Sequence, residues 1–330
     1  MKNDRSKIHP QLKNIAWLNP QLNLNKYRVV LINKVMPWFI KPQKCRDLII
    51  ENIFIDHPEC DQKLRLRLYR PRSENKPLPA LLWFHGGGYV IGTPEMDDKK
   101  SIEFALLLGI VVISVDYRLA PQHPFPAALE DGWAALKWAA TEGEKMGIDP
   151  ARIAIGGSSA GGGLAAALAQ FTHDRQEISP AFQLLVYPML DDRTVTRSDL
   201  KNRQFLIWPQ ESNQFGWESY LGQPCGEHAL PMYAVPARRE DLSGLPPAWI
   251  GVGSLDLFHD EVVAYAHNLS ECGVKCELVV VPGAFHGFDV VSHRMPIIRE
   301  FRDSQINALH ENLNSSKNSP IKLKSVFISG

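Results

Sequence analysis

The chain has 330 residues, 45% of them hydrophobic and 22% charged, which is typical of a globular protein long enough to bury a substantial core. Its 36 basic and 36 acidic residues give a formal net charge of zero, so the composition indicates neither a nucleic-acid partner nor an anionic membrane. The N-terminus lacks a signal-peptide core, and no early apolar stretch is long enough to span a bilayer.

The cysteines are few, odd in number and scattered, which favours reduced thiols over a disulfide framework and leaves no zinc-binding set. They are Cys45, Cys60, Cys225, Cys272 and Cys276. We therefore expect a cytoplasmic protein without integral membrane association. The first 50 residues precede any regular pattern, but their stretch VVLINKVMPWFI is apolar enough to pack against the rest of the chain.

From about residue 80 onward, short apolar runs alternate with helical patterns. The runs are rich in Val, Ile and Leu without clean alternation, as in strands buried on both faces of a sheet. Strands are expected at 80–84, 110–115, 152–157, 182–187, 248–253 and 276–281. Helices are expected at 128–140, 160–171, 259–273 and 292–313. Such alternation predicts an α/β fold with a mainly parallel central sheet and helices on both faces.

Residues 190–245 interrupt this alternation with a long insertion rich in aromatic side chains. An insertion above the C-terminal ends of parallel strands is placed to cover a ligand site, although a satellite core under a long connection is an equal alternative. Residues 314–330 are polar at first and are expected to be loosely held. The expected organisation is an N-terminal segment (1–50), a domain (51–313) that carries the insertion, and this tail.

The stretch GGSSAGGG at 156–163 fits the template G-x-S-x-G once, with Ser159 between Gly157 and Gly161. Centring the template on Ser158 fails, because Gly156 is then matched with Ala160. A nucleophile elbow turns sharply from strand to helix, so the residues two positions either side of the serine must be small. The start of the following helix favours developing negative charge near this serine.

A second glycine cluster, HGGG at 85–88, directly follows the expected strand 80–84. Glycines allow backbone N–H groups to approach an oxyanion, and such a loop supplies one or two donors. The N–H group of Ala160, the residue after the serine, supplies another. A tight glycine turn without a ligand is the alternative.

A serine nucleophile needs a base and an acid that orients the base. Of the seven histidines that follow Ser159, only His286 lies in a glycine-flanked loop directly after a strand. Asp256 comes immediately after the strand 248–253 and is the best candidate for the acid. The weaker candidates are Asp260 and Glu261, which suit the first turn of a helix, and Asp191 and Asp192, which lie one strand earlier.

With these residues in hand, the chain from about 78 to 300 resembles the hormone-sensitive-lipase-like (bacterial family IV) carboxylesterases of the α/β-hydrolase superfamily. The resemblance rests on HGGG, DYRLAPQHPFPAALED, GGSSAGG, YPMLDDR, GSLDLFHDE and PGAFHGF in this order. It implies the α/β-hydrolase fold, with residues 1–50 and 190–245 as a helical cap. It also implies Ser159 as nucleophile, His286 as base, Asp256 as acid, and an oxyanion hole formed by Gly87, Gly88 and Ala160, with Gly86 in the same loop.

Three residues depart from the family pattern. Ser158 stands where the elbow usually has Asp or Thr, which we expect to alter loop hydrogen bonds and not the chemistry. Gln122 replaces a glutamate, which puts a local salt bridge in doubt. Leu257 replaces a proline in the acid loop, where the turn is expected to be looser.

These residues predict a serine carboxylesterase that acts on short-acyl esters and needs neither metal nor organic cofactor. Bulky side chains of the insertion are expected to limit the acyl pocket, and the candidates for substrate contact are Phe205, Leu206, Trp208 and Phe215. Amides, carbamates or lactones are alternative substrates for the same triad, and a non-catalytic ligand receptor on this fold is a further alternative. A homodimer through the strand KCELVVV is expected if that strand forms an exposed edge.

Overall fold

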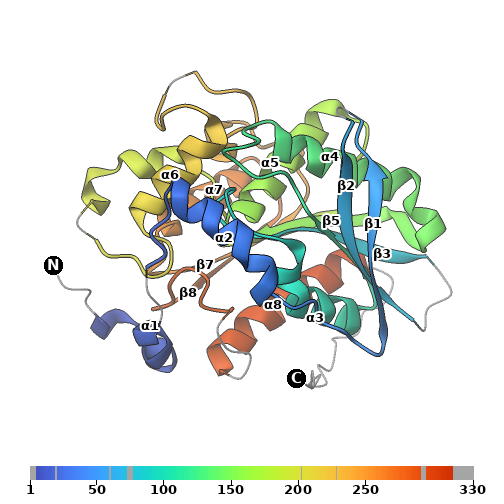
Figure 1. Cartoon of the computed structure of the whole chain (residues 1–330), viewed down its shortest axis with the longest axis horizontal. Helices are drawn as coiled ribbons and strands as arrows, with labels where there is room; N and C mark the ends of the chain where they lie inside the picture. The colour runs from blue at the N-terminus through green and yellow to red at the C-terminus, as the bar shows by residue number, and fades with distance from the viewer. Residues whose placement is uncertain are drawn as a thin grey trace.

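An eight-stranded sheet crosses the molecule in the order β1-β2-β4-β3-β5-β6-β7-β8 (Figure 1). The computed structural model describes residues 5–18, 21–58, 61–72, 77–201, 203–227, 229–290 and 295–314. The strands are β1 (Leu48–Asp56), β2 (Lys63–Pro71), β3 (Leu78–Phe84), β4 (Val111–Val115), β5 (Ile148–Ser158), β6 (Phe182–Val186), β7 (Ala248–Gly253) and β8 (Cys276–Val281). β2 pairs antiparallel with both β1 and β4, and all other neighbours are parallel.

The six expected strands are all present, with bounds that differ by a few residues. β5 extends from 148 to 158, and β6 ends at Val186, because the next residue, Tyr187, adopts a φ of 36°. Every residue of β3, β4, β6 and β7 is buried, as continuous apolar strands inside a parallel sheet require.

Two strands that were not expected lie before residue 80. β1 and β2 precede it as an antiparallel pair, and β1 begins at Leu48, so a domain boundary at residue 51 would cut this strand. β2 reads KLRLRLY, in which apolar and cationic residues alternate with the period of a half-buried strand. That alternation could have identified β2 from the sequence, although it differs from the all-apolar runs of the central strands.

Helices cover both faces of the sheet (Figure 1). On one face α5 packs on β5 and β6, with α4 and α7 beside it. On the other, α8 packs on β5, β6 and β7, next to α3. The helices are α1 (Lys13–Leu18), α2 (Lys26–Phe39), α3 (Asp98–Leu108), α4 (Ala127–Thr141), α5 (Ala160–Arg175), α6 (Gln210–Leu221), α7 (His259–Glu271) and α8 (Pro296–Leu313). The four expected helices correspond to α4, α5, α7 and α8, whereas α3 was not anticipated.

The N-terminal segment and the insertion pack against each other. The Leu22 N–H donates to the carbonyl of Ile207 at 3.0 Å, and the Leu24 N–H donates to Ser212 Oγ at 2.8 Å. We call residues 21–40 and 190–245 together the cap. In the described ranges no helix is both long and apolar enough to cross a membrane. The expected loose tail lies outside the described residues, apart from Asn314.

Candidate active site

Ser159 occupies a one-residue turn between β5, which ends at Ser158, and α5, which begins at Ala160. Its φ of 55° and ψ of −120° are strained for a residue with a side chain. A Cβ on Gly157 would lie 2.3 Å from the backbone of Gly161, and a Cβ on Gly161 would lie 2.1 Å from the carbonyl oxygen of Phe84. The small residues of the motif are therefore required because backbone segments approach each other here.

Hydrogen bonds join Ser159, His286 and Asp256 in one chain. The Ser159 hydroxyl donates to His286 Nε2 at 3.0 Å, and His286 Nδ1–H donates to Asp256 Oδ2 at 2.9 Å. The other oxygen of Asp256 accepts the N–H of Phe258 at 2.9 Å. All three side chains are buried. This geometry can transfer a proton from the hydroxyl to the imidazole while the carboxylate holds the ring in place.

The competing acids are engaged elsewhere. Asp260 pairs with His259 and Arg197 near the surface. Glu261 is buried, which raises its pKa well above the usual value, and it accepts the N–H groups that begin the insertion. Asp191 pairs with Arg193, and Asp192 pairs with Arg238.

Of the histidines in the described ranges, His286 is the one that contacts Ser159. His228 and His293 lie outside those ranges. Likewise, no cluster of three metal-ligating side chains occurs among the described residues.

Three aromatic rings surround the imidazole of His286. Tyr187 and Phe258 lie edge-on to it, with ring centroids 4.9 and 5.1 Å away, and Trp208 lies at 6.4 Å. Phe258 follows Asp256 by two residues, and Tyr187 directly follows β6 with a left-handed backbone. The ring is therefore held by packing as well as by its hydrogen bonds.

The glycine loop after β3 lies against Ser159, since a Cβ on Gly86 would be 3.4 Å from Ser159 Cβ. Gly87 and Gly88 have φ values of 121° and 61°, and a Cβ on Gly87 would be 2.0 Å from the Ile91 carbonyl oxygen. No acceptor within the described part of the chain engages the backbone N–H of Gly87, Gly88 or Ala160. These three donors are thus available for a ligand oxygen beside Ser159.

His85 fixes the start of this loop from inside the core. Its ring stacks on Tyr117 with centroids 4.3 Å apart, and its Nδ1–H donates to the Gly86 carbonyl at 2.8 Å. The Tyr117 hydroxyl donates to the His85 carbonyl at 2.9 Å. Complete burial lowers the pKa of His85, so the ring is neutral and serves as a structural donor.

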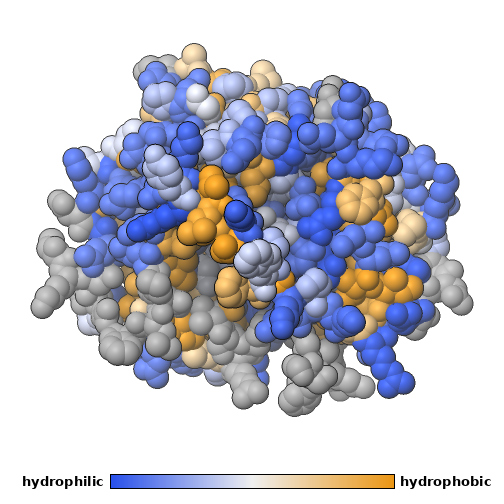
Figure 2. Space-filling model, viewed as in Figure 1, coloured by the Kyte–Doolittle hydropathy of each residue, from blue (hydrophilic) through white to orange (hydrophobic). Residues whose placement is uncertain are grey.

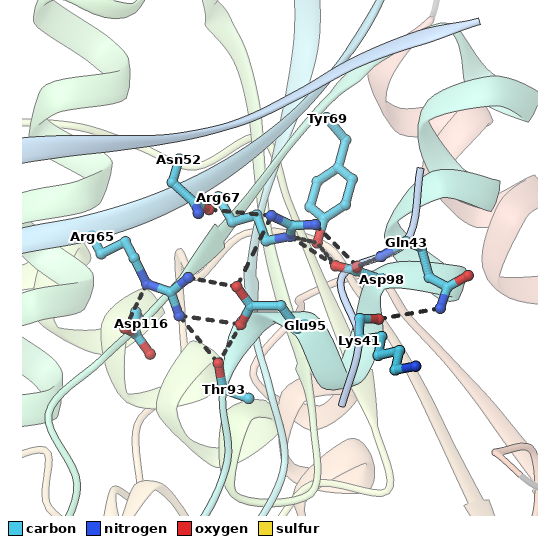
Figure 3. A network of polar contacts seen from close by, with 10 residues as sticks. All are labelled: Lys41, Gln43, Asn52, Arg65, Arg67, Tyr69, Thr93, Glu95, Asp98 and Asp116. Carbon is cyan, nitrogen blue, oxygen red and sulfur yellow. Dashed lines mark hydrogen bonds and ion pairs between the residues drawn. The ribbon is translucent and has the colours of Figure 1, made fainter. Parts of the chain in front are cut away.

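Two arginines of β2 fix the far end of the loop (Figure 3). Arg65 contacts Glu95 at 2.5 Å and Asp116 at 2.8 Å, while Arg67 contacts Asp98, the first residue of α3, at 2.8 Å. Burial raises the pKa of Glu95, but hydrogen bonds from Arg65 and Thr93 outweigh it and lower this pKa to about 2. Strand β2, which sequence reasoning missed, therefore anchors the loop that carries the glycines.

A buried ion pair lies behind His286. Asp289, three residues further along the chain, contacts Lys100 Nζ of α3 at 3.1 Å and accepts the Tyr187 hydroxyl at 2.7 Å. Burial raises the pKa of Asp289, but the charge of Lys100 and these hydrogen bonds outweigh it, so the net shift is downward. No motif marked this pair, because Lys100 is 189 residues away from Asp289 in the sequence.

Of the four expected cap contacts, Trp208 is the one with a ring contact to His286. A Cβ on Gly88 would be 2.1 Å from its ring, and its Nε1–H donates to Asn213 at 3.2 Å. Phe205 is buried, and its carbonyl accepts the side chain of Gln21 at 3.1 Å, which ties the insertion to the N-terminal segment. Leu206 and Phe215 are half-buried and pack on the core.

Ile207 is a neighbour of the site that the aromatic pattern did not reveal. It has a φ of 66°, and its Cδ1 lies 3.9 Å from where a Cβ on Gly287 would be. It also receives the hydrogen bond from Leu22. Nothing in the sequence marked Ile207 as a neighbour of the site, because it is an aliphatic residue in an insertion noted for its aromatic residues.

The three departures from the family pattern leave this geometry intact. Ser158 is buried beside Gly86, with Oγ 3.4 Å from where a Cβ on that glycine would be. Gln122 is exposed on the surface. Leu257 is buried, and Asp256 still receives the Phe258 N–H, so the acid loop is held without the proline.

The sequence of this chain is similar to those of known esterases. Residues 81–290 match the family model of the alpha/beta hydrolase fold. The carboxylesterase NlhH of Mycobacterium tuberculosis is 36% identical over 224 residues, which cover 68% of this chain and 70% of that protein. The esterase LipI of the same organism is 34% identical over 267 residues, with coverage of 80% and 82%. The ethyl acetate hydrolase of Pseudomonas putida is 34% identical over 246 residues, with coverage of 71% and 77%.

Solved structures agree with these relatives. The bacterial heroin esterase has a TM-score of 0.87 at 32% identity, over 93% of this chain and 98% of its own. The hyperthermophilic esterase of the archaeon Pyrobaculum calidifontis has a TM-score of 0.80 at 33% identity, over 92% and 98%. Both therefore share the fold across nearly their whole length.

Replacing Gly161 with Ala should lower stability by about 1–3 kcal/mol and displace Ser159, because the new methyl group meets the Phe84 carbonyl. We expect ester-hydrolysis kcat/KM to fall by on the order of 100-fold. Gly109→Ala is the control: its φ of 62° strains a residue with a side chain, but the space around it is open. It should reduce the unfolding free energy yet leave kcat/KM unchanged, and equal activities in the two variants would contradict this account.

Lys100→Met should lower the unfolding free energy by about 3–5 kcal/mol at neutral pH, because Asp289 is left as an uncompensated buried carboxylate. In the native protein the low pKa of Asp289 stabilises the fold above its unfolded pKa, and this contribution is lost as the pH falls. In the variant burial dominates the pKa of Asp289, and this carboxylate takes up a proton as the pH falls. The difference in unfolding free energy between wild type and variant should therefore shrink from pH 7.5 to pH 5.5. Urea unfolding measures this, with exposed Lys99→Met as control, and a pH-independent deficit would refute it.

Proposed function

Because the chain belongs to the α/β-hydrolase family, in its hormone-sensitive-lipase-like carboxylesterase branch, we propose that it hydrolyses short-acyl carboxylic esters through an acyl-enzyme on Ser159. The observation that carries this proposal is the hydrogen-bond chain from Ser159 through His286 to Asp256. A buried serine hydroxyl within 3.0 Å of an imidazole that is oriented by a carboxylate is the arrangement that activates an alcohol for acyl transfer.

In the acylation step, Ser159 Oγ attacks the ester carbonyl carbon as its proton moves to His286 Nε2. The carbonyl oxygen becomes an oxyanion that accepts the N–H groups of Gly87, Gly88 and Ala160. Collapse of this intermediate breaks the ester C–O bond, and His286 returns its proton to the leaving alcohol. Asp256 accepts Nδ1–H throughout and stabilises the imidazolium that forms.

Deacylation follows the same path with water as nucleophile. His286 takes a proton from water, the resulting hydroxide attacks the acyl carbonyl, and the same three N–H groups hold the second oxyanion. The proton then returns to Ser159 Oγ as the carboxylic acid leaves. The α5 N-terminus begins at Ala160 and adds a favourable field for negative charge at this point.

A preference for short acyl chains is supported by the cap. The ring of Trp208 fills the space next to Gly88, and Ile207 lies beside Gly287, so bulky side chains limit the room around the reacting carbonyl. The Pseudomonas putida relative is named for ethyl acetate, an ester with a two-carbon acyl group. Phe205, Leu206 and Phe215 are proposed to shape the outer part of the acyl or alcohol pocket.

We also infer a homodimer and a cytoplasmic location. β8 is an edge strand of the sheet, and its side chains Leu278 and Val280 are exposed, which suits pairing with a second copy. Cys45, Cys225, Cys272 and Cys276 are free thiols, in keeping with a reducing compartment.

Ser159→Ala should lower ester-hydrolysis kcat/KM at least about 1,000-fold, because the nucleophile is removed while the fold is kept. A fluorophosphonate probe read by intact mass should add one adduct to the wild-type chain and none to this variant. Ser158→Ala is the matched control and should retain both hydrolysis and labelling. Near-native turnover by Ser159→Ala would sink the assignment, and wild-type protein that takes up no adduct would favour a receptor.

A series of p-nitrophenyl esters tests the acyl preference. We expect kcat/KM for the butyrate to exceed that for the palmitate by on the order of tenfold or more, since the longer chain must displace cap side chains. Trp208→Ala should narrow the ratio, while Trp138→Ala, on α4, should not change it. Comparable rates for both esters in the wild-type protein would overturn the preference.

A further inference from the structure

Helix α2 presents an apolar face to solvent. Tyr27 is 85% exposed, Leu31 60% and Trp38 76%, and Val30 and Phe39 are also exposed, at 52% and 79%. Figure 2 shows an apolar patch, surrounded by hydrophilic side chains, on the face of the molecule that α2 crosses in Figure 1. Large apolar side chains exposed together, and not singly, mark an interaction surface.

The exposed residues share one side of the helix. Tyr27, Leu31 and Trp38 stand at i, i+4 and i+11, so they form a single line along the axis, and Lys34 lies in the same line at i+7. The opposite side faces the protein. Val29 is fully buried there, and the Asn33 side chain donates to the Val90 carbonyl at 2.8 Å. The helix thus carries apolar side chains on two opposite sides. The inner side packs on the protein, and no described residue covers the outer side.

Positive charge is concentrated in α2 and in the few residues that follow it. Residues 26–46 contain six cations and no aspartate or glutamate, although the whole chain is neutral. None of the six forms an ion pair with a residue that the structure describes, and all are exposed. They are Lys26, Arg28, Lys34, Lys41, Lys44 and Arg46. The sequence expectation that no anionic membrane is a partner relied on the overall charge balance, which hides this local excess.

Hydrogen bonds fix the position of this helix next to the glycine loop. Asn25 caps the helix by accepting the Arg28 N–H at 3.0 Å, and beyond the C-terminus the Gln43 N–H donates to Asp98 at 2.5 Å (Figure 3). The Asn33–Val90 hydrogen bond connects α2 to the glycine loop, because Val90 is two residues from Gly88. Whatever docks on α2 therefore lies over the cap, and the docking surface is formed before binding.

We propose that the outer face of α2 docks the protein on anionic lipid bilayers. A helix with Trp, Tyr, Phe and Leu on one face and Lys and Arg around it suits the boundary between headgroups and acyl chains. The apolar side chains enter the boundary and the cations meet lipid phosphates. Lys34, in the middle of the line, can extend its ammonium group toward the headgroups while its methylenes stay apolar.

Charge favours a lipid surface over a second copy of this chain. A two-fold contact through α2 would bring Lys26, Arg28 and Lys34 of both copies together, and the like charges would repel. An anionic bilayer supplies the opposite charge over the whole length of the helix. The inference does not depend on the proposed esterase activity. If that activity holds, docking would bring the cap to esters dissolved in the bilayer.

Co-sedimentation with extruded vesicles tests this surface. The full chain should bind vesicles of phosphatidylcholine and phosphatidylglycerol (7:3) at least tenfold more tightly than pure phosphatidylcholine vesicles in 50 mM NaCl. Binding should weaken at least tenfold in 500 mM NaCl, because salt screens the cations. No binding to the anionic vesicles, or equal binding to both compositions, would refute the proposal.

Paired variants separate the two contributions. Leu31→Ser with Trp38→Ser removes apolar contact, and Lys26→Glu with Lys34→Glu and Lys41→Glu reverses charge. Each set should weaken binding to the anionic vesicles at least tenfold. All substituted side chains are exposed, so the thermal unfolding midpoint should stay unchanged and serves as the check on folding.

The controls make equivalent changes elsewhere on the surface. Phe54→Ser with Met232→Ser alters two exposed apolar residues, and Lys137→Glu with Lys275→Glu and Arg299→Glu makes the same change in net charge. Both sets should retain binding within twofold. Equal losses in the control and α2 variants would overturn the assignment to α2. A dimer in analytical ultracentrifugation that only the α2 apolar variant abolishes would show instead that this face joins two copies.

Discussion

A single residue joins the central strand β5 to helix α5, and the site depends on the close backbone approach that this turn imposes. Ser159 adopts φ 55° and ψ −120°, a conformation that costs on the order of 1–3 kcal/mol and persists only where the surroundings enforce it. Here β5 is paired on both sides, with β3 and β6, and α5 packs on the same strands. The same turn brings the Ala160 N–H and the Ser159 hydroxyl to one point.

The surrounding structure keeps groups from distant parts of the chain in register with this turn. His286 comes from the loop after β8, Asp256 from the loop after β7, and the glycine loop from the end of β3. Parallel strands bring these loops to the same edge of the sheet, which is why residues 127 positions apart can lie 3.0 Å from each other. Buried and half-buried polar groups then hold each loop: His85 and Arg65 hold the glycine loop, and Asp289 holds the region behind His286.

Local motifs in the sequence pointed to residues that the structure brings together. Gly157 and Gly161 identified Ser159, because the steric requirement of a sharp strand-to-helix turn acts within five residues. The apolar runs identified the six strands from β3 to β8. The antiparallel pair β1 and β2 was missed, since an exposed edge strand and an alternating cationic strand do not resemble buried parallel strands. Lys100 and Asp289 were missed because their pairing arises only when α3 and the His286 loop meet.

The exposed face of α2 also depends partly on local sequence and partly on tertiary contacts. The segment was recognised as apolar enough to pack on something, and its inner residue Val29 does so. Which of its apolar residues remain outside depends on where the helix docks, and that is decided by Asn33, Gln43 and their distant partners. Whole-chain charge could not reveal that the six cations of this segment form no ion pair with a described residue.

The sequence by itself determined the order of the central strands along the chain, the serine at the elbow, the glycine loop, and the pairing of chemical types that a hydrolase needs. Only the tertiary structure decided which neighbours hold these groups: Tyr187, Ile207, Lys100 and the arginines of β2. The physical reason is distance along the chain. Steric and periodic constraints act between residues a few positions apart and leave a pattern. Buried ion pairs and ring contacts join residues that become neighbours only after the sheet and its helices have assembled.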